Sequence, residues 1–383
     1  MKKSNIAKIF LFNAALCENF RVARRIVITE YLWRSENMKR KIICSIAAFV
    51  IMALLPFLSM GSIERETAPV SDEMAAEESS QSESTTPEVS SETERQSHEN
   101  QGFRILDTSS GKIVNVDERE FCCGALGYEM APLYEIEALK AQCVACYTHF
   151  CMLREKQRSE PDPDLKGADF SADLSKSQIW LSNDQMKKKW GDLYERSRQR
   201  IDQAVDECFG EVLCDDKGKL IDAAYFALSS GNTENASDIF GFDSPYLRAA
   251  PSPFDLKAPD QTSETTVSAE KLCSALTALK KDFSLPDKKD GRIGTAERTP
   301  SGTVLKIKIG SQEFTGAEIR NALNLRSANF DIDDEGDSFV FTTRGYGHGV
   351  GLSQYGANAL AQQGSDYQEI LHHYYGSASI EKY

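Results

Sequence analysis

The sequence lacks an excess of positive charge, because 44 lysine and arginine residues stand against 58 aspartate and glutamate residues. The resulting formal net charge of −14 argues against a nucleic-acid partner, since nucleic-acid-binding proteins carry basic surfaces that neutralise phosphates. The sequence also lacks internal repeats. At 383 residues the chain is too long for one average domain, so we expect segments of different physical character.

A second absence is that of charge within one long segment. Residues 42–60, IICSIAAFVIMALLPFLSM, contain no charged side chain over 19 residues, which is long enough for a helix to cross a bilayer. Three basic residues stand directly before them at 39–41, and basic flanks mark the cytoplasmic side. We therefore predict a single-pass anchor in the cell membrane at 42–60. Residues 1–41 would then be a cytosolic tail, and the rest of the chain would lie outside the cytoplasm.

Two alternatives to this interpretation of the N-terminus remain open. A cleaved signal peptide would need small residues at its cleavage site, and the stretch from Phe57 to Ser62 places them poorly, which favours an uncleaved anchor. Met38 directly precedes the basic triplet and is an alternative start of the natural protein. In that case residues 1–37 are an artefact of an upstream start site.

Residues 62–100 lack phenylalanine, tryptophan, tyrosine, leucine and cysteine. They hold eleven acidic and two basic residues, and such a composition cannot bury enough apolar surface to order itself. We predict a disordered acidic linker over 61–102, extended by its like charges, which leads to a folded domain over 103–383. Eleven acidic minus two basic residues leave nine of the 14 net negative charges in this linker, so the folded part is nearly balanced.

Eight of the ten cysteines follow the predicted anchor. They are Cys122, Cys123, Cys143, Cys146, Cys151, Cys208, Cys214 and Cys273. A disulfide framework is one interpretation for an exported protein, but a domain as large as 103–383 has a core that needs no such bonds. Free thiols are the other interpretation, and the sequence predicts no particular pairing.

The folded part mixes strand-like and helix-like patterns without the alternation typical of parallel α/β proteins, which predicts an α+β fold with two lobes. We expect the inner lobe around residues 262–335. Apolar residues at three- and four-residue spacing predict an amphipathic helix over 137–153. Further expected helices are 184–208, 268–281 and 367–375. Expected strands are 103–107 paired with 111–117, then 119–128, 210–213, 220–228, 303–309 and 337–343.

The most distinctive motif is RGYGHGVGLSQYG, which runs from Arg344 to Gly356. It sets His348 among four closely spaced glycines and follows them with Ser353 and Gln354. Glycine permits φ above zero and lets a ligand approach the main chain closely, at a cost in chain entropy that an ordinary turn seldom repeats. A glycine-rich bend in a β-domain is the structural alternative, so the motif alone does not decide the function.

Four sequence blocks follow one another in the folded part. They are Tyr128-Glu-Met-Ala-Pro with Glu137–Gln142, Ala224–Asn235, Pro245-Tyr-Leu with Pro251–Asp255, and Arg344–Gly356 with Ile370–Gly376. Together they resemble the stage II sporulation protein D family, peptidoglycan lytic transglycosylases of spore-forming bacteria. The resemblance extends over 103–383 and includes 315–320 and 325–327. A single anchor followed by an outward domain agrees with the layout of that family.

The resemblance implies an enzyme that cleaves the β-1,4 bond between N-acetylmuramic acid (MurNAc) and N-acetylglucosamine (GlcNAc) in glycan strands stripped of stem peptides. Its products carry 1,6-anhydro-MurNAc ends, and it uses no cofactor. The implied setting is engulfment during sporulation, beside a cell-wall amidase and a membrane-anchor protein of the engulfment complex. Two alternatives are a glycan-binding scaffold without the chemistry and a generic exported wall-binding module.

The implied reaction needs one group that protonates the departing glycosidic oxygen and then deprotonates the C6 hydroxyl of MurNAc, and one carboxyl can perform both steps. Two glutamates compete for this role. Glu137 begins a predicted helix, where the dipole favours the anion and suits a cap. Glu129 is expected in a loop between apolar residues, which would desolvate it and raise its pKa. The catalytic acid of the family also corresponds to Glu129, which we predict to be the acid and the base.

The chain departs from the family pattern at two positions close to this acid. Family members commonly have Glu-Met-Pro, whereas here Ala131 intervenes and the proline is Pro132, which changes how the segment presents the acid. Family members also often have arginine near the position of Tyr147. Both departures bear on how active the implied enzyme would be.

The cysteines and the histidine at 143–151 invite a zinc interpretation, because thiols and imidazoles are zinc ligands. On one straight helix, Cys143 and Cys146 lie on the apolar stripe while Cys151 points away, so four ligands cannot converge. In the family Cys143 and Cys146 correspond to alanines, which favours a packing role. Zinc in some members is bound by cysteine and histidine after this helix, and residues 152–207 contain neither, so we predict no metal.

Groups that can hydrogen-bond a sugar chain follow the expected strand at 220–228. The predicted substrate contacts there are Ser229, Ser230, Gly231 and Thr233. A turn held by serine and threonine side chains is the structural alternative. The predicted contacts in the glycine motif are Tyr346, His348, Ser353, Gln354 and Tyr355.

Three further assignments concern charged and aromatic side chains. His348 would either hydrogen-bond the sugar or brace the glycine loop. Arg344 or Lys140 would meet the lactyl carboxylate of MurNAc, although surface cations are often only solvated. The histidines and tyrosines at 372–375 would pack as part of the last helix, the tyrosines beneath the glycan site.

Overall fold

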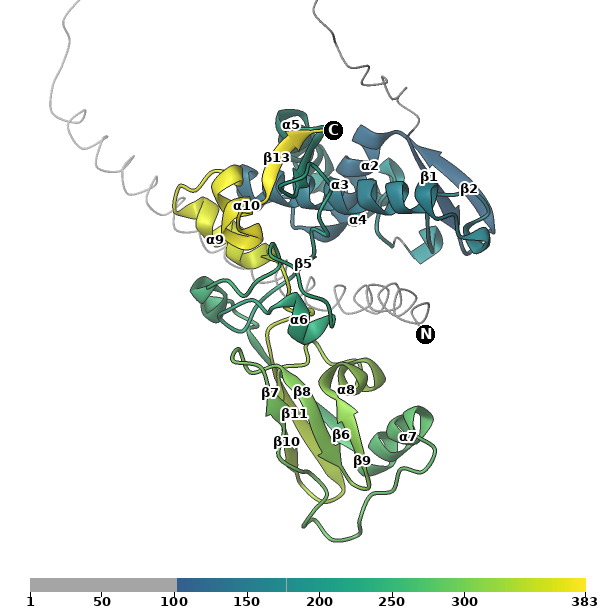
Figure 1. The fold of residues 1–383 in the computed structure, drawn as a ribbon, viewed down its shortest axis with the longest axis vertical. Coiled ribbons are helices and arrows are strands. Elements are labelled where there is room, and N and C mark those ends of the chain that lie inside the picture. The colour runs from purple at the N-terminus through teal and green to yellow at the C-terminus, as the bar shows by residue number, and fades with distance from the viewer. Residues whose placement is uncertain (1–101, 177) are drawn as a thin grey trace, which may run out of the picture. The chain divides into compact units, whose positions relative to one another are not determined.

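The structure is a computed structural model that describes residues 102–383 apart from Ser177. The predicted anchor at 42–60 lies outside the described residues, as does nearly all of the predicted linker. Among the described residues, no helix combines the length and apolar character that crossing a membrane requires. These residues form a mixture of helices and several small sheets, in agreement with the predicted mixed class (Figure 1).

Residues 102–260 are mainly helical. Their helices are α2 (Glu118–Glu129), α3 (Ile136–Ser159), α4 (Asn183–Trp190), α5 (Tyr194–Cys208) and α6 (Ala236–Ile239). Single 3₁₀ turns are η2 (Pro163–Leu165), η3 (Leu174–Lys176), η4 (Gly191–Leu193) and η5 (Pro253–Lys257). The strands are β1 (Phe103–Asp107), β2 (Lys112–Val116), β3 (Phe170–Ala172), β4 (Glu211–Cys214) and β5 (Tyr225–Phe226).

Residues 262–383 contain most of the strands. These are β6 (Thr262–Ser268), β7 (Glu297–Arg298), β8 (Val304–Ile309), β9 (Gln312–Thr315), β10 (Phe330–Asp334), β11 (Ser338–Arg344), β12 (Leu352–Ser353) and β13 (Ser379–Lys382). The helices are α7 (Ala269–Leu279), α8 (Gly316–Leu323), α9 (Gln354–Gln362) and α10 (Tyr367–Tyr375).

The predicted hairpin at the start of the folded part is confirmed. β1 and β2 pair antiparallel, and Gly111 has a φ of +70° at the turn, a conformation that glycine adopts without steric cost. β1 also pairs in parallel with β3, which the sequence did not predict, because a strand of three residues is too short for an alternating pattern.

Residues 119–128 form most of helix α2, so the strand predicted there was wrong. The helix begins after Asp117, whose side chain accepts a hydrogen bond from the backbone N–H of Glu120 at 3.0 Å. Every residue from 121 to 127 is buried. A continuous buried run does not distinguish a strand from a buried helix by its periodicity, which explains the error.

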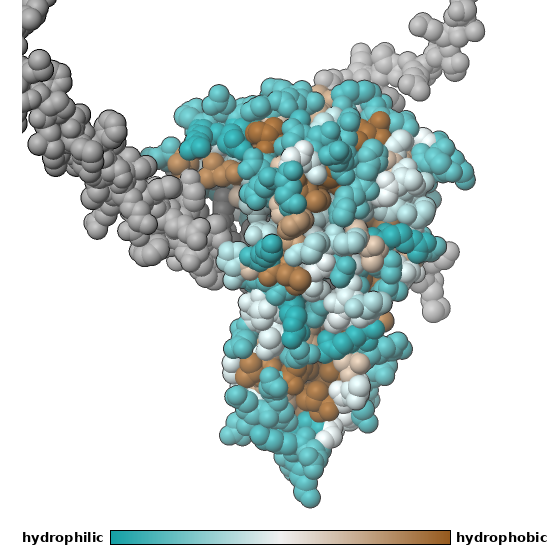
Figure 2. All heavy atoms as spheres, turned by 90° about the vertical axis from the view of Figure 1, so that its left-hand side faces the viewer, coloured by the Kyte–Doolittle hydropathy of each residue, from teal (hydrophilic) through white to brown (hydrophobic). Residues whose placement is uncertain are grey.

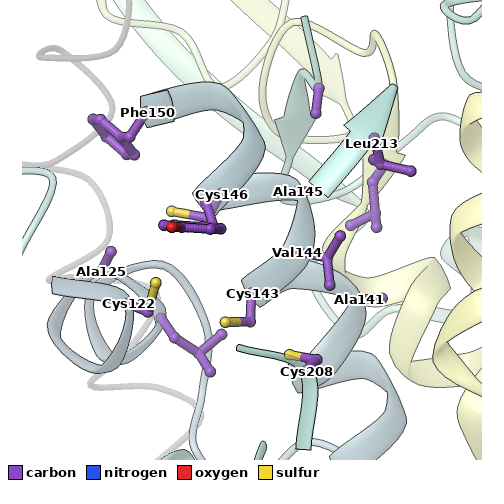
Figure 3. Close-up of a cluster of buried hydrophobic side chains, with 14 of the residues drawn as sticks. Cys122, Ala125, Ala141, Cys143, Val144, Ala145, Cys146, Phe150, Cys208 and Leu213 are labelled. Carbon is purple, nitrogen blue, oxygen red and sulfur yellow. The ribbon is translucent and has the colours of Figure 1, made fainter. Parts of the chain in front are cut away.

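The predicted helix at 137–153 is confirmed as α3, which runs through the first of two hydrophobic cores. Figure 3 shows Cys143 and Cys146 of α3, Cys122 of α2 and Cys208 of α5 among apolar neighbours. All eight cysteines of the described residues are free thiols. The packing role predicted for Cys143 and Cys146 is confirmed, because their side chains are buried at 2% and 3% exposure.

Tyr147 also belongs to this core, and its hydroxyl donates to the carboxylate of Glu118. The same carboxylate accepts a hydrogen bond from Arg154 at 2.7 Å, and both partners of this ion pair are nearly inaccessible. Breaking such a pair would leave an uncompensated buried charge. The departure from the family pattern at Tyr147 is therefore part of the packing that joins α2 to α3.

The second core lies within residues 267–341. The sheet β10-β11-β6 and the sheet β7-β8-β9 contribute to it, and helices α7 and α8 pack against them (Figure 1). α8 begins at Thr315 with a capping box, in which Thr315 and Glu318 each hydrogen-bond the other's backbone N–H. The expected helix at 268–281 and the expected strands at 303–309 and 337–343 are confirmed as α7, β8 and β11.

Other expected elements were only partly correct. The single helix expected at 184–208 is two helices, α4 and α5, separated at Gly191, whose φ is +52°. Of the strand expected at 220–228, only Tyr225 and Phe226 form a strand, while Leu220 and Leu228 form isolated bridges. β6 was missed because Val267 is its only buried residue, so its sequence shows no apolar alternation.

The surface of the described residues carries hydrophobic groups in separate places. Figure 2 shows small hydrophobic patches on one face, divided by hydrophilic surface. The large apolar side chains that are at least 37% exposed are Ile113, Leu133, Leu193, Phe242, Leu256, Leu279 and Tyr383. Scattered apolar side chains of this kind are usual on soluble domains and do not by themselves indicate an interface.

Candidate functional site

Glu129 is the last residue of helix α2, so its expected position in a loop was wrong. The chain leaves the helix at Met130, whose backbone is extended with φ −118° and ψ 156°. Pro132 prevents the helix from continuing, because a proline has no N–H to donate to the carbonyl of Tyr128 four residues earlier. The carboxyl of Glu129 is thereby placed on a rigid element instead of a free loop.

The carboxyl of Glu129 is partly buried and surrounded by groups from several elements. The hydroxyl of Tyr225 in β5 lies 3.5 Å from Oε1 and 3.7 Å from the thiol of Cys146 in α3. Burial raises the pKa of Glu129 to about 7, although hydrogen bonding from Gln354, the positive charge of Lys189, and Tyr225 oppose this shift. A carboxyl with this pKa can release a proton and take one up near neutral pH.

Tyr225 is suited to remain a hydrogen-bond donor in this site. Burial raises the pKa of its phenol well above the ordinary value, so the hydroxyl stays protonated at neutral pH. Its position next to Glu129 was not predicted, although it lies in the block Ala224–Asn235 that carries part of the family resemblance.

The glycine motif packs against that same block. The four glycines at 345, 347, 349 and 351 all have positive φ, between +74° and +120°. A Cβ at Gly347 would lie 2.6 Å from the Cβ of Phe226, and a Cβ at Gly351 would lie 1.9 Å from the carbonyl oxygen of Ala224. The motif therefore needs glycine both for its backbone conformation and for close approach to another chain segment.

Backbone hydrogen bonds hold the glycine motif on the block at 224–234. Leu228 and Tyr346 exchange two of them, at 3.0 and 2.7 Å, and the N–H of Glu234 donates to Gly349 at 2.7 Å. β12 continues the contact by pairing in parallel with β5. Because β12 leads directly into α9, this pairing brings Gln354, the first residue of α9, to the carboxyl of Glu129.

His348 braces the glycine motif. Its ring packs 5.2 Å from the ring of Phe240 and 5.7 Å from that of Phe226, measured between centroids. Burial, together with the charge of Arg320, lowers the pKa of His348 to about 3, so the ring is neutral at physiological pH. Its Nδ1 accepts a hydrogen bond from the N–H of Val350 at 3.1 Å, which leaves the proton on Nε2. Direct contact of His348 with a sugar stays a prediction.

Asp255 holds two predicted site segments together, and its role was not predicted. One carboxylate oxygen of this fully buried residue accepts from the N–H of Ser229 at 2.8 Å and from the hydroxyl of Ser353 at 2.7 Å. Ser353 also caps α9 by accepting from the N–H of Gly356. Asp255 thus fixes the start of the helix that presents Gln354.

Most of the predicted substrate contacts are buried and already have partners. Lys140, Ser229, Thr233, Tyr346, Ser353 and Gln354 are at most 8% exposed. The ammonium of Lys140 pairs with Glu137 at 2.6 Å and with Glu207 at 3.1 Å. Thr233 accepts a hydrogen bond from the N–H of Ala250, and Gly231 donates to the hydroxyl of Ser229. These contacts indicate structural roles, and binding of a glycan by these residues stays a prediction.

The partly exposed members of the predicted set are Ser230, Arg344, His348 and Tyr355. The hydroxyl of Ser230 donates to the carbonyl of Ser301 at 3.0 Å, and Arg344 pairs with Asp331 at 2.7 Å. Their side chains are nevertheless partly exposed to solvent, and contact of these residues with a glycan stays a prediction.

Glu137, the competing acid, is occupied at the start of α3. Its carboxylate pairs with Lys140 and accepts a hydrogen bond from the backbone N–H of Tyr367 at 2.9 Å. These contacts join α3 to the start of α10 and agree with the structural role that its position predicts. Within residues 102–383, leaving out 177, no group of three or more histidine, cysteine, aspartate or glutamate side chains is arranged to hold a metal ion.

The tyrosines of α10 are buried beneath the glycine motif and the block at 224–234. The hydroxyl of Tyr375 donates to the carbonyl of Ala224 at 2.9 Å. Tyr374 exchanges a hydrogen bond with Ser252, also at 2.9 Å, and His373 contacts the carbonyl of Pro251. The expected packing of the two tyrosines is confirmed, whereas His372 and His373 are exposed.

Comparisons with known proteins give consistent similarities. Residues 107–214 match a family model described as "Stage II sporulation protein", and residues 243–351 match a domain of unknown function, DUF8618. Stage II sporulation protein D of Bacillus amyloliquefaciens is 34% identical over 279 residues, which cover 73% of this chain and 78% of that protein. The protein of the same name from Bacillus subtilis is 34% identical over 278 residues, with the same coverage. The amidase enhancer of Bacillus subtilis is 25% identical over 68% of this chain and 40% of its own length.

Proposed function

The chain belongs to the stage II sporulation protein D family, whose role is related to sporulation, and we propose that it is a peptidoglycan lytic transglycosylase. The enzyme would cleave the β-1,4 bond between MurNAc and GlcNAc in glycan strands and leave 1,6-anhydro-MurNAc ends. The observation that carries this proposal is the environment of Glu129, a partly buried carboxyl with a pKa of about 7 beside a hydroxyl and an amide donor.

The reaction divides into two proton transfers through the same carboxyl. First, protonated Glu129 gives its proton to the glycosidic oxygen, the bond from that oxygen to C1 of MurNAc breaks, and the GlcNAc end leaves with a new hydroxyl. Next, the Glu129 carboxylate takes the proton of the C6 hydroxyl of the same MurNAc while O6 bonds to C1. The anhydro ring closes, no water is consumed, and Glu129 is protonated again.

The neighbours of Glu129 support both steps. The phenol of Tyr225 and the amide of Gln354 are neutral donors, and they stabilise the carboxylate that exists between the two transfers. Gln354 is held in turn by the amide oxygen of Gln142 at 3.4 Å and by the Asp255 contacts at the start of α9. A donor fixed in this way does not have to reorganise when the charge develops.

The wider setting is part of the same proposal. We propose strands stripped of stem peptides as substrate, engulfment as the process, and a cell-wall amidase and a membrane-anchor protein as partners. The similarity to a protein named amidase enhancer supports the amidase as partner. The uncharged segment at 42–60 supports a single-pass anchor in the cell membrane with the catalytic domain outside the cytoplasm.

The test is the incubation of the full-length protein, in mild detergent, with glycan strands stripped of peptides. We expect products that end in 1,6-anhydro-MurNAc, identified by mass spectrometry after chromatographic separation. Products with reducing ends would instead indicate hydrolysis. If the protein binds the strands and releases neither product, the proposal is wrong and a glycan-binding scaffold is the remaining function.

The pH dependence of this activity follows from the raised pKa of Glu129. The first step needs the protonated carboxyl, and the folded protein keeps it protonated up to a pKa of about 7. We therefore expect kcat/KM to fall as the pH rises above about 7, roughly tenfold per pH unit. Initial rates measured from about pH 5 to about pH 9 at constant ionic strength test this. A rate that stays constant to the alkaline end would contradict Glu129 as general acid.

A further inference from the structure

Lys189 of helix α4 reaches the end of the helix that carries Glu129. Its ammonium donates a hydrogen bond to the carbonyl of Gly127 and lies 3.4 Å from the carbonyl oxygen of Tyr128. Both carbonyls belong to the last turn of α2, where no further helical N–H is available to them. A cation at this position also complements the negative end of the helix dipole.

The backbone of Lys189 is held in place by its neighbours on α4. A Cβ at Gly127 would lie 3.0 Å from the ring of Trp190 and 3.2 Å from the sulfur of Met186, so α4 packs directly on the last turn of α2. Trp190 and Met186 are at most 9% exposed, and α4 begins with a capping box at Ser182. The ammonium is therefore delivered to Gly127 by a packed helix, not by a loop.

Lys189 is also a cation close to the carboxyl of Glu129. The titratable groups that face this carboxyl are Lys189 from α4, His149 and Cys146 from α3, and Tyr225 from β5. Cys146 and Tyr225 remain neutral at neutral pH, because burial raises the pKa of both. Lys189 thus places a lysine ammonium from α4 among the groups that face this carboxyl.

We propose that Lys189 is the positioning residue of the proposed acid. It holds the last turn of α2 and stabilises the Glu129 carboxylate that forms when the proton passes to the leaving sugar. The role of Lys189 in catalysis rests on the proposed function of Glu129. Burial alone would leave a carboxyl that binds its proton too tightly to act as an acid, and the nearby cation offsets part of that effect.

Three variants at Lys189 and one control test this proposal. Lys189→Met removes the charge and the donor, Lys189→Gln keeps a donor without charge, and Lys189→Arg keeps the charge. We expect the methionine and glutamine variants to lose about tenfold in kcat at neutral pH with little change in KM. The alkaline limb of their rate profiles should shift by about one unit toward higher pH. Lys189→Arg should retain most of the activity and the original limb. Lys188 lies on the exposed side of the same helix, so Lys188→Met should match wild type in kcat and in the pH of the alkaline limb.

A measurement without turnover separates this inference from the proposed function. Difference infrared spectra of the full-length protein against Glu129→Gln isolate the carboxyl band of Glu129, and its titration gives the pKa directly. We expect this pKa to be higher in Lys189→Gln than in wild type and Lys189→Arg.

If the titration and the rate profile do not move while activity falls, Lys189 is merely structural and the inference is wrong. If the wild type makes no anhydro products but the titration moves as expected, the proposed function fails and the effect of Lys189 on the carboxyl stands. Melting curves of the three variants identify any that do not fold, and the glutamine variant keeps a neutral hydrogen-bond donor at this position.

Discussion

We expect the Glu129→Gln variant to release anhydromuramic products about 10²- to 10⁴-fold more slowly than wild type, because glutamine can neither donate nor accept the transferred proton. Glutamine has nearly the same shape as glutamate and keeps an oxygen for the hydroxyl of Tyr225. Binding of glycan strands should therefore be nearly unchanged. The measurements are initial rates of product release and a sedimentation assay of strand binding, both with full-length protein.

Glu137→Gln is the matched control, since Glu137 is the other glutamate that the sequence offers as an acid. Its carboxylate pairs with Lys140 at 2.6 Å, so the variant should lose some stability and keep most of its activity. Equal activity of Glu129→Gln and wild type would exclude Glu129 as the acid. A large loss in Glu137→Gln with a normal melting curve would transfer the role to Glu137.

The Glu129→Gln variant should also be more stable than wild type at alkaline pH. The pKa of Glu129 is raised by burial from 4.5 to about 7, so the folded state binds this proton more tightly than the unfolded state does. The wild type therefore loses stability as the pH rises from 4.5 through about 7, whereas glutamine does not titrate. We expect an advantage of about 1 kcal/mol for Glu129→Gln above about pH 8, less than full burial would give because the carboxyl is partly exposed. Thermal unfolding at acidic and alkaline pH measures the difference.

The second large effect is expected for Gly351→Ala in the glycine motif. The added Cβ would lie 1.9 Å from the carbonyl oxygen of Ala224, and the residue has a φ of +79°. A backbone atom cannot rotate away as a side chain can, so β12 would have to separate from β5. We expect a loss of at least about 3 kcal/mol in the free energy of unfolding, measured by denaturant titration. Activity should fall as well, because β12 leads directly into α9, whose first residue, Gln354, hydrogen-bonds Glu129.

Gly210→Ala is the control that separates backbone strain from collision. Gly210 has a φ of +80°, nearly that of Gly351, but a Cβ there would meet no atom within 4 Å. This variant should lose only about 1 kcal/mol, the cost of the left-handed conformation itself. Equal losses in the two variants would show that the close approach of Gly351 to Ala224 contributes nothing.

The elements that the sequence predicted best are those in which one face is buried and the other is not. The expected helix at 367–375 coincides with α10, and α3 contains all of the helix expected at 137–153. α2 was mistaken for a strand because residues 121–127 are buried without interruption. β6 was missed for the opposite reason, since six of its seven residues remain at least partly exposed. In both cases tertiary packing, not local pattern, determined the element.

The sequence by itself determined the family, singled out Glu129 as the candidate acid and indicated the need for glycine in the motif that begins at Arg344. Residue types and their order along the chain are sufficient for these conclusions. Only the tertiary structure decided what sets the pKa of that glutamate. The pKa of Glu129 depends on its burial, on Gln354 and Tyr225, and on the charge of Lys189. These groups come from distant parts of the chain. Desolvation and electrostatic interaction depend on distances in space, and no local sequence pattern contains those distances.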